Sequence, residues 1–162
     1  MISIDEHRAI CELLYCEARF ADGAKYDDWE SLLTDDMEYW VPIEHDNPNP
    51  ETQLSLLYDN RSRVATRIRM LKTGVRHAQV PPSPMTRLIS NVEVESVGDD
   101  EYTVSSAFML GELQIQSTGD LHWWIGRVEH RIRRVDGELK IARKRVDLIN
   151  SKEPVPALAF LI

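Results

Sequence analysis

Histidine and cysteine side chains are the ones best suited to hold a metal ion, and this chain of 162 residues has five and two of them. His122 and His130 lie eight residues apart in a segment with strand-like alternation, which would separate them by about 26 Å. They cannot share a metal ion at that distance. The sequence also lacks Cys-x-x-Cys, His-Glu-x-x-His, phosphate-loop and Gly-x-Ser-x-Gly patterns. We therefore expect no metal, cofactor or catalytic residue within this chain.

Acid–base catalysis in an apolar pocket is the alternative chemistry that the residues leave open. A carboxylate with a raised pKa beside a Tyr or His could abstract a proton there, and the candidates are Tyr39, Asp59, His77 and His122. Each also has a structural interpretation. Tyr39 can be a core aromatic, Asp59 a helix N-cap ahead of Asn60, and His77 a loop residue.

Charge and cysteine usage restrict the partners and the compartment. The net charge of −8 argues against free binding to nucleic acid or to an anionic membrane. Cys11 and Cys16 would lie about 140° apart around a helix, so we expect them to be reduced. The first residues are acidic rather than basic, and no apolar run approaches the roughly 20 residues that span a bilayer. We expect a cytoplasmic protein.

Two adjacent tryptophans, Trp123 and Trp124, must point to opposite faces of their strand. One face of a strand in a lone domain usually meets solvent, so this pair indicates that both faces are covered. A run of basic residues lies nearby and could form a charged rim around such an aromatic contact. The alternative is that these cations only form cross-strand pairs at the surface. They are Arg131, Arg133, Arg134, Lys140, Arg143, Lys144 and Arg145.

The first half of the chain has the pattern of helices. Ser3 and Glu6 form a capping box, and the apolar periodicity behind them predicts a helix that ends at Asp22 and Gly23. A short helix is expected over 26–33 and a strand over 37–43 that ends, or lies at an edge, because of its proline. A third helix is expected over 61–72, with apolar residues on one face and five cations on the other.

The second half has the pattern of strands. Four are expected, over 86–97, 102–116, 120–135 and 138–150, and the turn at Asp136 and Gly137 is a strong hairpin signal. Short connections predict an antiparallel meander. In the third strand, apolar residues at odd positions up to Ile125 give way to even positions from Val128. Either a bulge or sharp bend near Gly126 or cover on both faces would explain the change. We expect a curved sheet around about three helices, an α+β fold in a single domain over 1–162.

The order of these features resembles the small (beta) subunit of aromatic-ring-hydroxylating dioxygenases of the benzoate and anthranilate type. The likeness covers nearly the whole chain, with Arg87 standing where the family often has histidine. The residues that carry it are Glu17-Ala18-Arg19-Phe20, Asp22, Trp29, Leu33, Tyr39, Val41-Pro42, Asp59-Asn60-Arg61, Arg67, Arg69, Thr73-Gly74, Pro81-Pro82-Ser83, Ile89-Ser90-Asn91-Val92, Arg143-Lys144-Arg145 and Leu158-Ala159-Phe160-Leu161-Ile162.

The resemblance implies a cone-shaped fold of the cystatin-like and nuclear-transport-factor-like group, which ketosteroid isomerase and scytalone dehydratase share. It also implies a structural role in an NADH-dependent dioxygenase of aromatic catabolism. The Rieske [2Fe–2S] cluster and mononuclear iron would belong to the large (alpha) subunit. Three small and three large chains would form a hexamer, with a trimer of small chains, and a reductase or ferredoxin would supply electrons.

On this interpretation polar and aromatic residues at the ends of the helices and strands make contacts between subunits. A stand-alone cone-fold isomerase or dehydratase, or a small-molecule-binding module, remains the alternative. The residues expected at the subunit interface are Arg61, Arg67, Arg69, Arg87, Asn91, Trp123 and Trp124.

Overall fold

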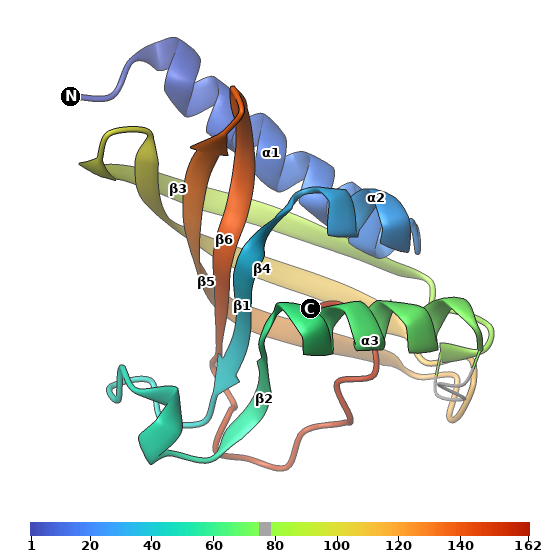
Figure 1. Ribbon diagram of the computed structural model, residues 1–162. Helices are drawn as coiled ribbons and strands as arrows, with labels where there is room; N and C mark the ends of the chain where they lie inside the picture. Colours follow the sequence, from blue (N-terminus) through green and yellow to red (C-terminus); the bar gives the residue numbers. More distant parts are fainter. Residues whose placement is uncertain (75–78) are drawn as a thin grey trace.

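A computed structural model describes residues 1–74 and 79–162. Within these residues three α-helices and six β-strands follow one another, with a short 3-10 helix between the first two strands (Figure 1). The helices are α1 (Ile4–Asp22), α2 (Tyr26–Ser31) and α3 (Arg61–Lys72), and the 3-10 helix is η1 (Pro50–Thr52). The strands are β1 (Leu33–Pro42), β2 (Ser55–Asp59), β3 (Met85–Gly98), β4 (Glu101–Leu113), β5 (Leu121–Val135) and β6 (Glu138–Leu148).

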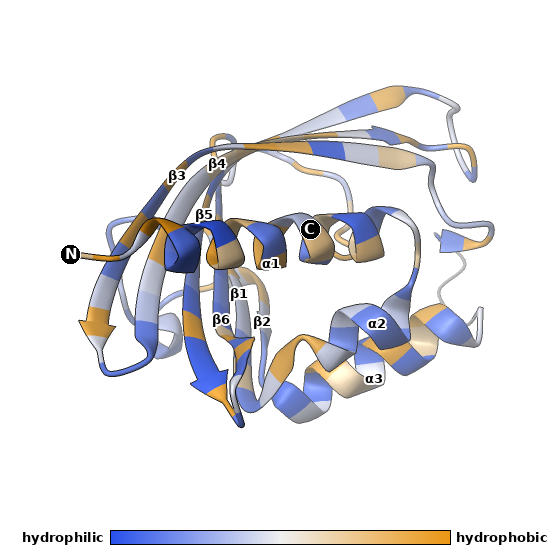
Figure 2. Ribbon diagram, turned by 90° about the horizontal axis from the view of Figure 1, so that it is seen from above, coloured by the Kyte–Doolittle hydropathy of each residue, from blue (hydrophilic) through white to orange (hydrophobic). Residues whose placement is uncertain are grey.

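The six strands form one sheet in the order β2-β1-β6-β5-β4-β3. From β3 to β6 the strands follow each other as the predicted antiparallel meander, and β1 joins β6 through a parallel ladder. The sheet curls around the helices, and α1 crosses its concave side (Figure 2). This arrangement confirms the predicted cone-shaped α+β fold.

Local signals fix the ends of the helices. The Ser3 side chain accepts a hydrogen bond from the Glu6 amide, as the capping box predicts, and Gly23 caps the other end of α1. The third helix has the predicted bounds, but its N-cap is Asn60, whose side chain accepts from the Arg63 amide. The prediction that Asp59 caps this helix is therefore wrong by one residue, and the Asp59 carboxylate is free for another partner.

Of the two irregularities expected in β5 near Gly126, the bulge is not found. β4 and β5 pair without a shift along their whole length, and the shift between β5 and β6 lies at Arg131 and Ile132. Gly126 serves a different need, because a Cβ there would lie 2.2 Å from the main-chain oxygen of Asp147 on β6. The odd-numbered residues Leu121 and Trp123 are instead exposed on the outer face of the sheet, beside Leu88 of β3 and Met109 of β4. These four residues are called here the apolar patch.

The buried core lies between the concave face of the sheet and the three helices. Helix α1 contributes Ile10, Leu13 and Leu14, and the sheet contributes the even-numbered side chains of β4 and β5. Among residues 1–74 and 79–162, no helix is both long and apolar enough to cross a membrane.

Candidate functional site

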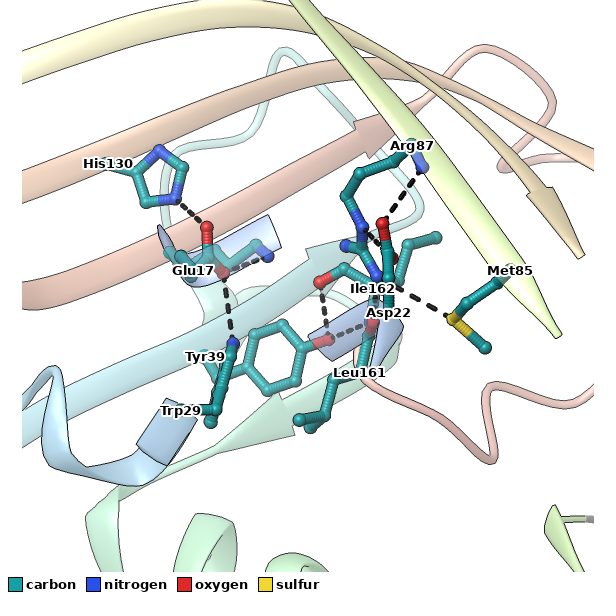
Figure 3. Close-up of polar contacts among 10 residues, drawn as sticks. Glu17, Asp22, Trp29, Tyr39, Met85, Arg87, His130, Leu161 and Ile162 are labelled. Atoms are coloured by element: carbon teal, nitrogen blue, oxygen red, sulfur yellow. Dashed lines mark hydrogen bonds and ion pairs between the residues drawn. The ribbon is translucent and has the colours of Figure 1, made fainter. Parts of the chain in front are cut away.

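A cluster of three ionisable residues lies inside the cone, each at most 3% exposed as a whole residue. Glu17 comes from α1, His130 from β5 and Lys144 from β6 (Figure 3). One carboxylate oxygen of Glu17 accepts from the Lys144 ammonium and from the indole N–H of Trp29 at 3.3 Å. The other oxygen lies 3.2 Å from Nε2 of His130. A single carboxylate thus joins a helix to two strands of the sheet.

The electrostatics of the cluster favour a permanently charged carboxylate. Burial alone would raise the pKa of Glu17, but the Lys144 charge and the His130 hydrogen bond outweigh it and hold that pKa well below its usual range. Burial lowers the pKa of Lys144. A general base that works near neutral pH needs the opposite, a carboxyl with a raised pKa. The cluster therefore has the properties of a structural ion pair.

The segment 158–162, called here the interior segment, fills the rest of the cone. Its last four residues are buried, and the ring of Phe160 meets Trp124 of β5 edge to face at 5.3 Å. The hydroxyl of Tyr39 on β1 makes two 2.9 Å hydrogen bonds with the main chain of Ile162 (Figure 3). Burial raises the pKa of Tyr39, so this hydroxyl stays protonated.

Arg87 holds the interior segment from the side of β3. Its Nε donates to Asp22 at 2.7 Å and its Nη2 donates to the main-chain oxygen of Leu161 at 2.8 Å (Figure 3). The Arg87 amide also donates to Asp22, at 3.0 Å. The end of α1, the start of β3 and the interior segment are thereby fixed to one another.

Arg67 does the same from the side of α3. It pairs with Asp59 of β2 at 2.8 Å, and both side chains are 12% exposed. Its Nη1 lies 3.4 Å from the main-chain oxygen of Leu158. Each of the two arginines thus neutralises a carboxylate and donates to a main-chain oxygen of the interior segment, which a lysine could do less well because it lacks the planar fork of donors.

A cavity of about 20 Å³ remains beside these groups. Its lining includes Glu17, Arg87, His130, Lys144 and Ile162. This volume holds about one water molecule. The interior is therefore a filled core with charged cross-links and not a chamber for a substrate.

Three of the four residues considered for acid–base chemistry, Tyr39, Asp59 and His122, lie in or near this interior. Tyr39 and Asp59 are paired residues of the β1–β2 ladder; Tyr39 binds the interior segment directly, and Asp59 binds Arg67, which contacts that segment. His122 packs edge to face on Trp124 with ring centroids 4.8 Å apart. His77 lies outside the described residues.

The four arginines expected at a subunit interface differ in their surroundings. Arg61 is partly buried and pairs with Glu30 at 2.7 Å, and Arg67 and Arg87 are engaged as described above. Arg69 is exposed on α3. An interface role stays a prediction for all four, but only Arg69 presents an exposed side chain.

The other three interface candidates also divide between core and surface. Trp124 is 1% exposed and its indole N–H donates to Glu112 at 2.9 Å. Trp123 is 52% exposed on the outer face and lies against Gly111 of β4. Asn91 is exposed, with a φ of 52° at the point where the β3–β4 register shifts. The two tryptophans point to opposite faces as predicted, and the outer one is half open to solvent.

The basic residues near the tryptophans are paired within the chain, but only Arg131 and Arg143 form the cross-strand pairs that the alternative predicted, with Glu101 and with Glu38 and Glu129. Arg133 pairs with Asp36, Arg134 with Glu6, and Arg145 with Asp147 at 2.9 Å. Each of the other four, Arg131, Lys140, Arg143 and Lys144, also has a carboxylate within 4.0 Å.

Sequence reasoning missed the buried ion pair. Glu17 follows Leu13 and Leu14 by four and three residues, so it belongs to the apolar face of α1, and this position was the available signal. A carboxylate on a core-facing stripe needs a buried partner. Nothing in the sequence identified Lys144, 127 residues away, as that partner.

Comparison with known proteins first defines the class. The fold matches a protein with a cystatin-like fold from Nostoc punctiforme, with a TM-score of 0.59, 13% identity and coverage of 91% of this chain and 93% of that one. A family of known sequences described as "Ring hydroxylating beta subunit" matches residues 16–153. The chain belongs to this family, as its residues indicated.

Two relatives illustrate the range of similarity. The small oxygenase component of the p-cumate 2,3-dioxygenase system of Pseudomonas putida is 32% identical over 136 residues, which cover 83% of this chain and 74% of the relative. The crystal structure of the beta subunit of benzoate 1,2-dioxygenase from Burkholderia mallei has a TM-score of 0.76 and 26% identity, and covers 99% of each chain. Among the described residues, no group of three or more His, Cys, Asp or Glu side chains could hold a metal ion.

Proposed function

We propose that this chain is the non-catalytic, structural small subunit of a bacterial Rieske non-haem iron dioxygenase that hydroxylates aromatic rings. The Rieske cluster and the mononuclear iron would be held by a large subunit, and electrons from NADH would arrive through a reductase or ferredoxin. Three copies of each chain would form a cytoplasmic hexamer, with this chain contributing one domain over 1–162.

One observation carries the structural role. The interior segment fills the cone, and the side chains that could do acid–base work there are used to hold it. Tyr39 binds Ile162, Asp59 is neutralised by Arg67, and the pKa of Glu17 is held well below its usual range. A stand-alone isomerase or dehydratase would need an open chamber, and about 20 Å³ remains. Family membership supports the dioxygenase assignment, because the relatives are named as small components and beta subunits.

The outer face of β3, β4 and β5 supports the role of a subunit. Leu88, Met109, Leu121 and Trp123 are exposed there, around a groove of about 400 Å³. Exposed large apolar side chains that gather in one place mark interaction sites more often than scattered ones do. We propose that this apolar patch contacts another subunit with Trp123 as its anchor, and that Arg61, Arg67, Arg69, Arg87 and Asn91 contribute directly or by positioning neighbours.

Co-expression with a Rieske large subunit tests this function. A tag on this chain should recover a complex that contains iron and acid-labile sulfide, while the chain purified alone should contain neither and should not turn over arenes. Trp123→Ala should weaken recovery of the complex without unfolding the chain, because its side chain is half exposed. Recovery of the chain as a lone monomer in the presence of the large subunit would contradict the proposal.

A further inference from the structure

A second groove, of about 620 Å³, lies between the end of α1 and the start of β3. Tyr15, Arg19 and Phe20 line it from α1, Lys25 from the turn that follows, and Thr86 and Ile89 from β3. Its size is within the range of grooves that accept a ligand or several side chains of a partner. None of the residues so far proposed for subunit contact, except Arg87 in its floor, belongs to this groove.

The charge balance of the groove is positive. Asp22, the acidic residue of the lining, is neutralised by Arg87 at 2.7 Å. Arg19 and Lys25 are both exposed, and neither forms an ion pair within residues 1–74 and 79–162. The Arg19 guanidinium donates to Cys16 Sγ at 3.0 Å, which leaves its charge uncompensated. The groove is therefore locally cationic in a chain whose net charge is −8.

One of these cations has an ordinary explanation. Arg19 lies in the last turn of α1, where a positive charge complements the helix dipole. Lys25 lies beyond the cap at Gly23, so the dipole does not account for it. Tyr15 also needs another explanation, because it is 45% exposed, whereas Phe20 packs against the core and reaches the groove with its open part. Tyr, Phe and Arg are enriched at protein interfaces.

The groove adjoins the apolar patch. Thr86 lines both the cationic groove and the apolar groove of the outer face, so the two meet at the start of β3. β3 is also the terminal strand of the sheet order within the part of the chain that the structure describes. A partner segment that crosses this end of β3 would touch cations and aromatics on one side and Leu88 and Trp123 on the other.

We propose that the groove between α1 and β3 docks an acidic segment of the large subunit, whose carboxylates pair with Arg19 and Lys25 and whose apolar side chains reach Tyr15 and the apolar patch. The inference rests on the proposed function, since that function supplies the partner. Complementary charge on such a rim acts mainly on the rate of encounter, and apolar contact acts mainly on dissociation. The two parts of the groove can therefore be tested separately.

The test measures assembly of the full chain with the large subunit by surface-immobilised binding at several salt concentrations. R19E/K25E should slow association about tenfold and flatten its salt dependence. Tyr15→Ala should instead speed dissociation. The matched control is R8E/K152E, which makes the same charge change at two exposed cations that already have partners in Glu12 and Glu44. The control should leave both rates near those of the unmodified chain.

The outcomes separate the inference from the function on which it rests. If the unmodified chain assembles and R19E/K25E assembles at the same rate, the docking inference is wrong and the proposed function stands. If the unmodified chain does not assemble at all, both are wrong. If R19E/K25E changes only the mass of this chain alone, the groove binds a second copy and the proposed occupant is wrong. Thermal unfolding of each variant should stay close to that of the unmodified chain, because the substituted side chains are exposed, with a small loss for R19E/K25E from the dipole of α1.

Discussion

Replacing Glu17 by glutamine should destabilise the fold more than any surface substitution on the same helix. The change is nearly isosteric, but it leaves the Lys144 ammonium buried without a counter-charge and weakens the contact with His130. The side chains of Glu17 and Lys144 are only 4% and 3% exposed, so bulk solvent does not reach the ammonium to replace the lost counter-charge. Breaking a buried ion pair in this way costs about 3–5 kcal/mol of unfolding free energy.

A double-mutant cycle shows whether the cost comes from the pair. Lys144→Met alone leaves the carboxylate with His130 and Trp29, and it should also be destabilising. E17Q/K144M removes both charges, so it should cost less than the two single changes together, with a coupling of about 1–3 kcal/mol. The costs do not add because each single change leaves one buried charge without its partner, whereas the double change leaves neither.

Denaturant unfolding followed by far-ultraviolet circular dichroism measures these values, at one fixed protein concentration because self-association would shift the midpoint. Glu12→Gln is the matched control, since Glu12 lies on the same helix in an exposed i,i+4 pair with Arg8 and should change stability by less than about 0.5 kcal/mol. If Glu17→Gln costs no more than this control, or if the two single costs simply add in the double variant, the ion pair does not hold the cone together.

Three further expectations follow from the interior. The pKa of Glu17 is lower in the folded chain than the unfolded value of about 4.3, so the contribution of this carboxylate to stability is present above that pH and is lost as pH falls below it. The denaturant concentration at the unfolding midpoint should therefore drop in acid more for the unmodified chain than for Glu17→Gln. Phe160→Ala should lower the free energy of unfolding in denaturant by about 3–5 kcal/mol, because removing this buried ring leaves a cavity in the core. A loss below about 1 kcal/mol would mean that the interior segment is not part of that core. Gly126→Ala should lower the melting temperature because its Cβ would clash with the main chain of Asp147, while Gly98→Ala, whose Cβ would lie 3.9 Å from the nearest neighbouring atom, should be nearly neutral.

Local chemistry made much of the fold predictable. The cap at Ser3, the stop at Gly23 and the hairpin at Asp136 and Gly137 each act within a few residues, and the structure has all of them. The meander followed from short connections between strand patterns. The N-cap of α3 was missed by one position because Asp59 and Asn60 are both good caps, and only the partner Arg67 decides between them.

The interior of the cone could not be predicted in the same way, because its contacts join residues far apart in the chain. The bond from Tyr39 to Ile162 spans 123 residues, and that from Arg87 to Leu161 spans 74. The interior segment has no helical or strand periodicity from which its burial could be predicted. Arginines are also usually exposed, so Arg67 and Arg87 looked like surface residues until their partners were seen.

The mass of the complex formed on co-expression with a Rieske large subunit tests the central claim most directly. Native mass spectrometry should show an assembly with three copies of this chain and three of the large chain, and all of the iron should remain with the large chain when the two are separated. A chain that stays monomeric beside a folded, iron-loaded large subunit, or that carries the iron itself, would contradict a structural role in the dioxygenase.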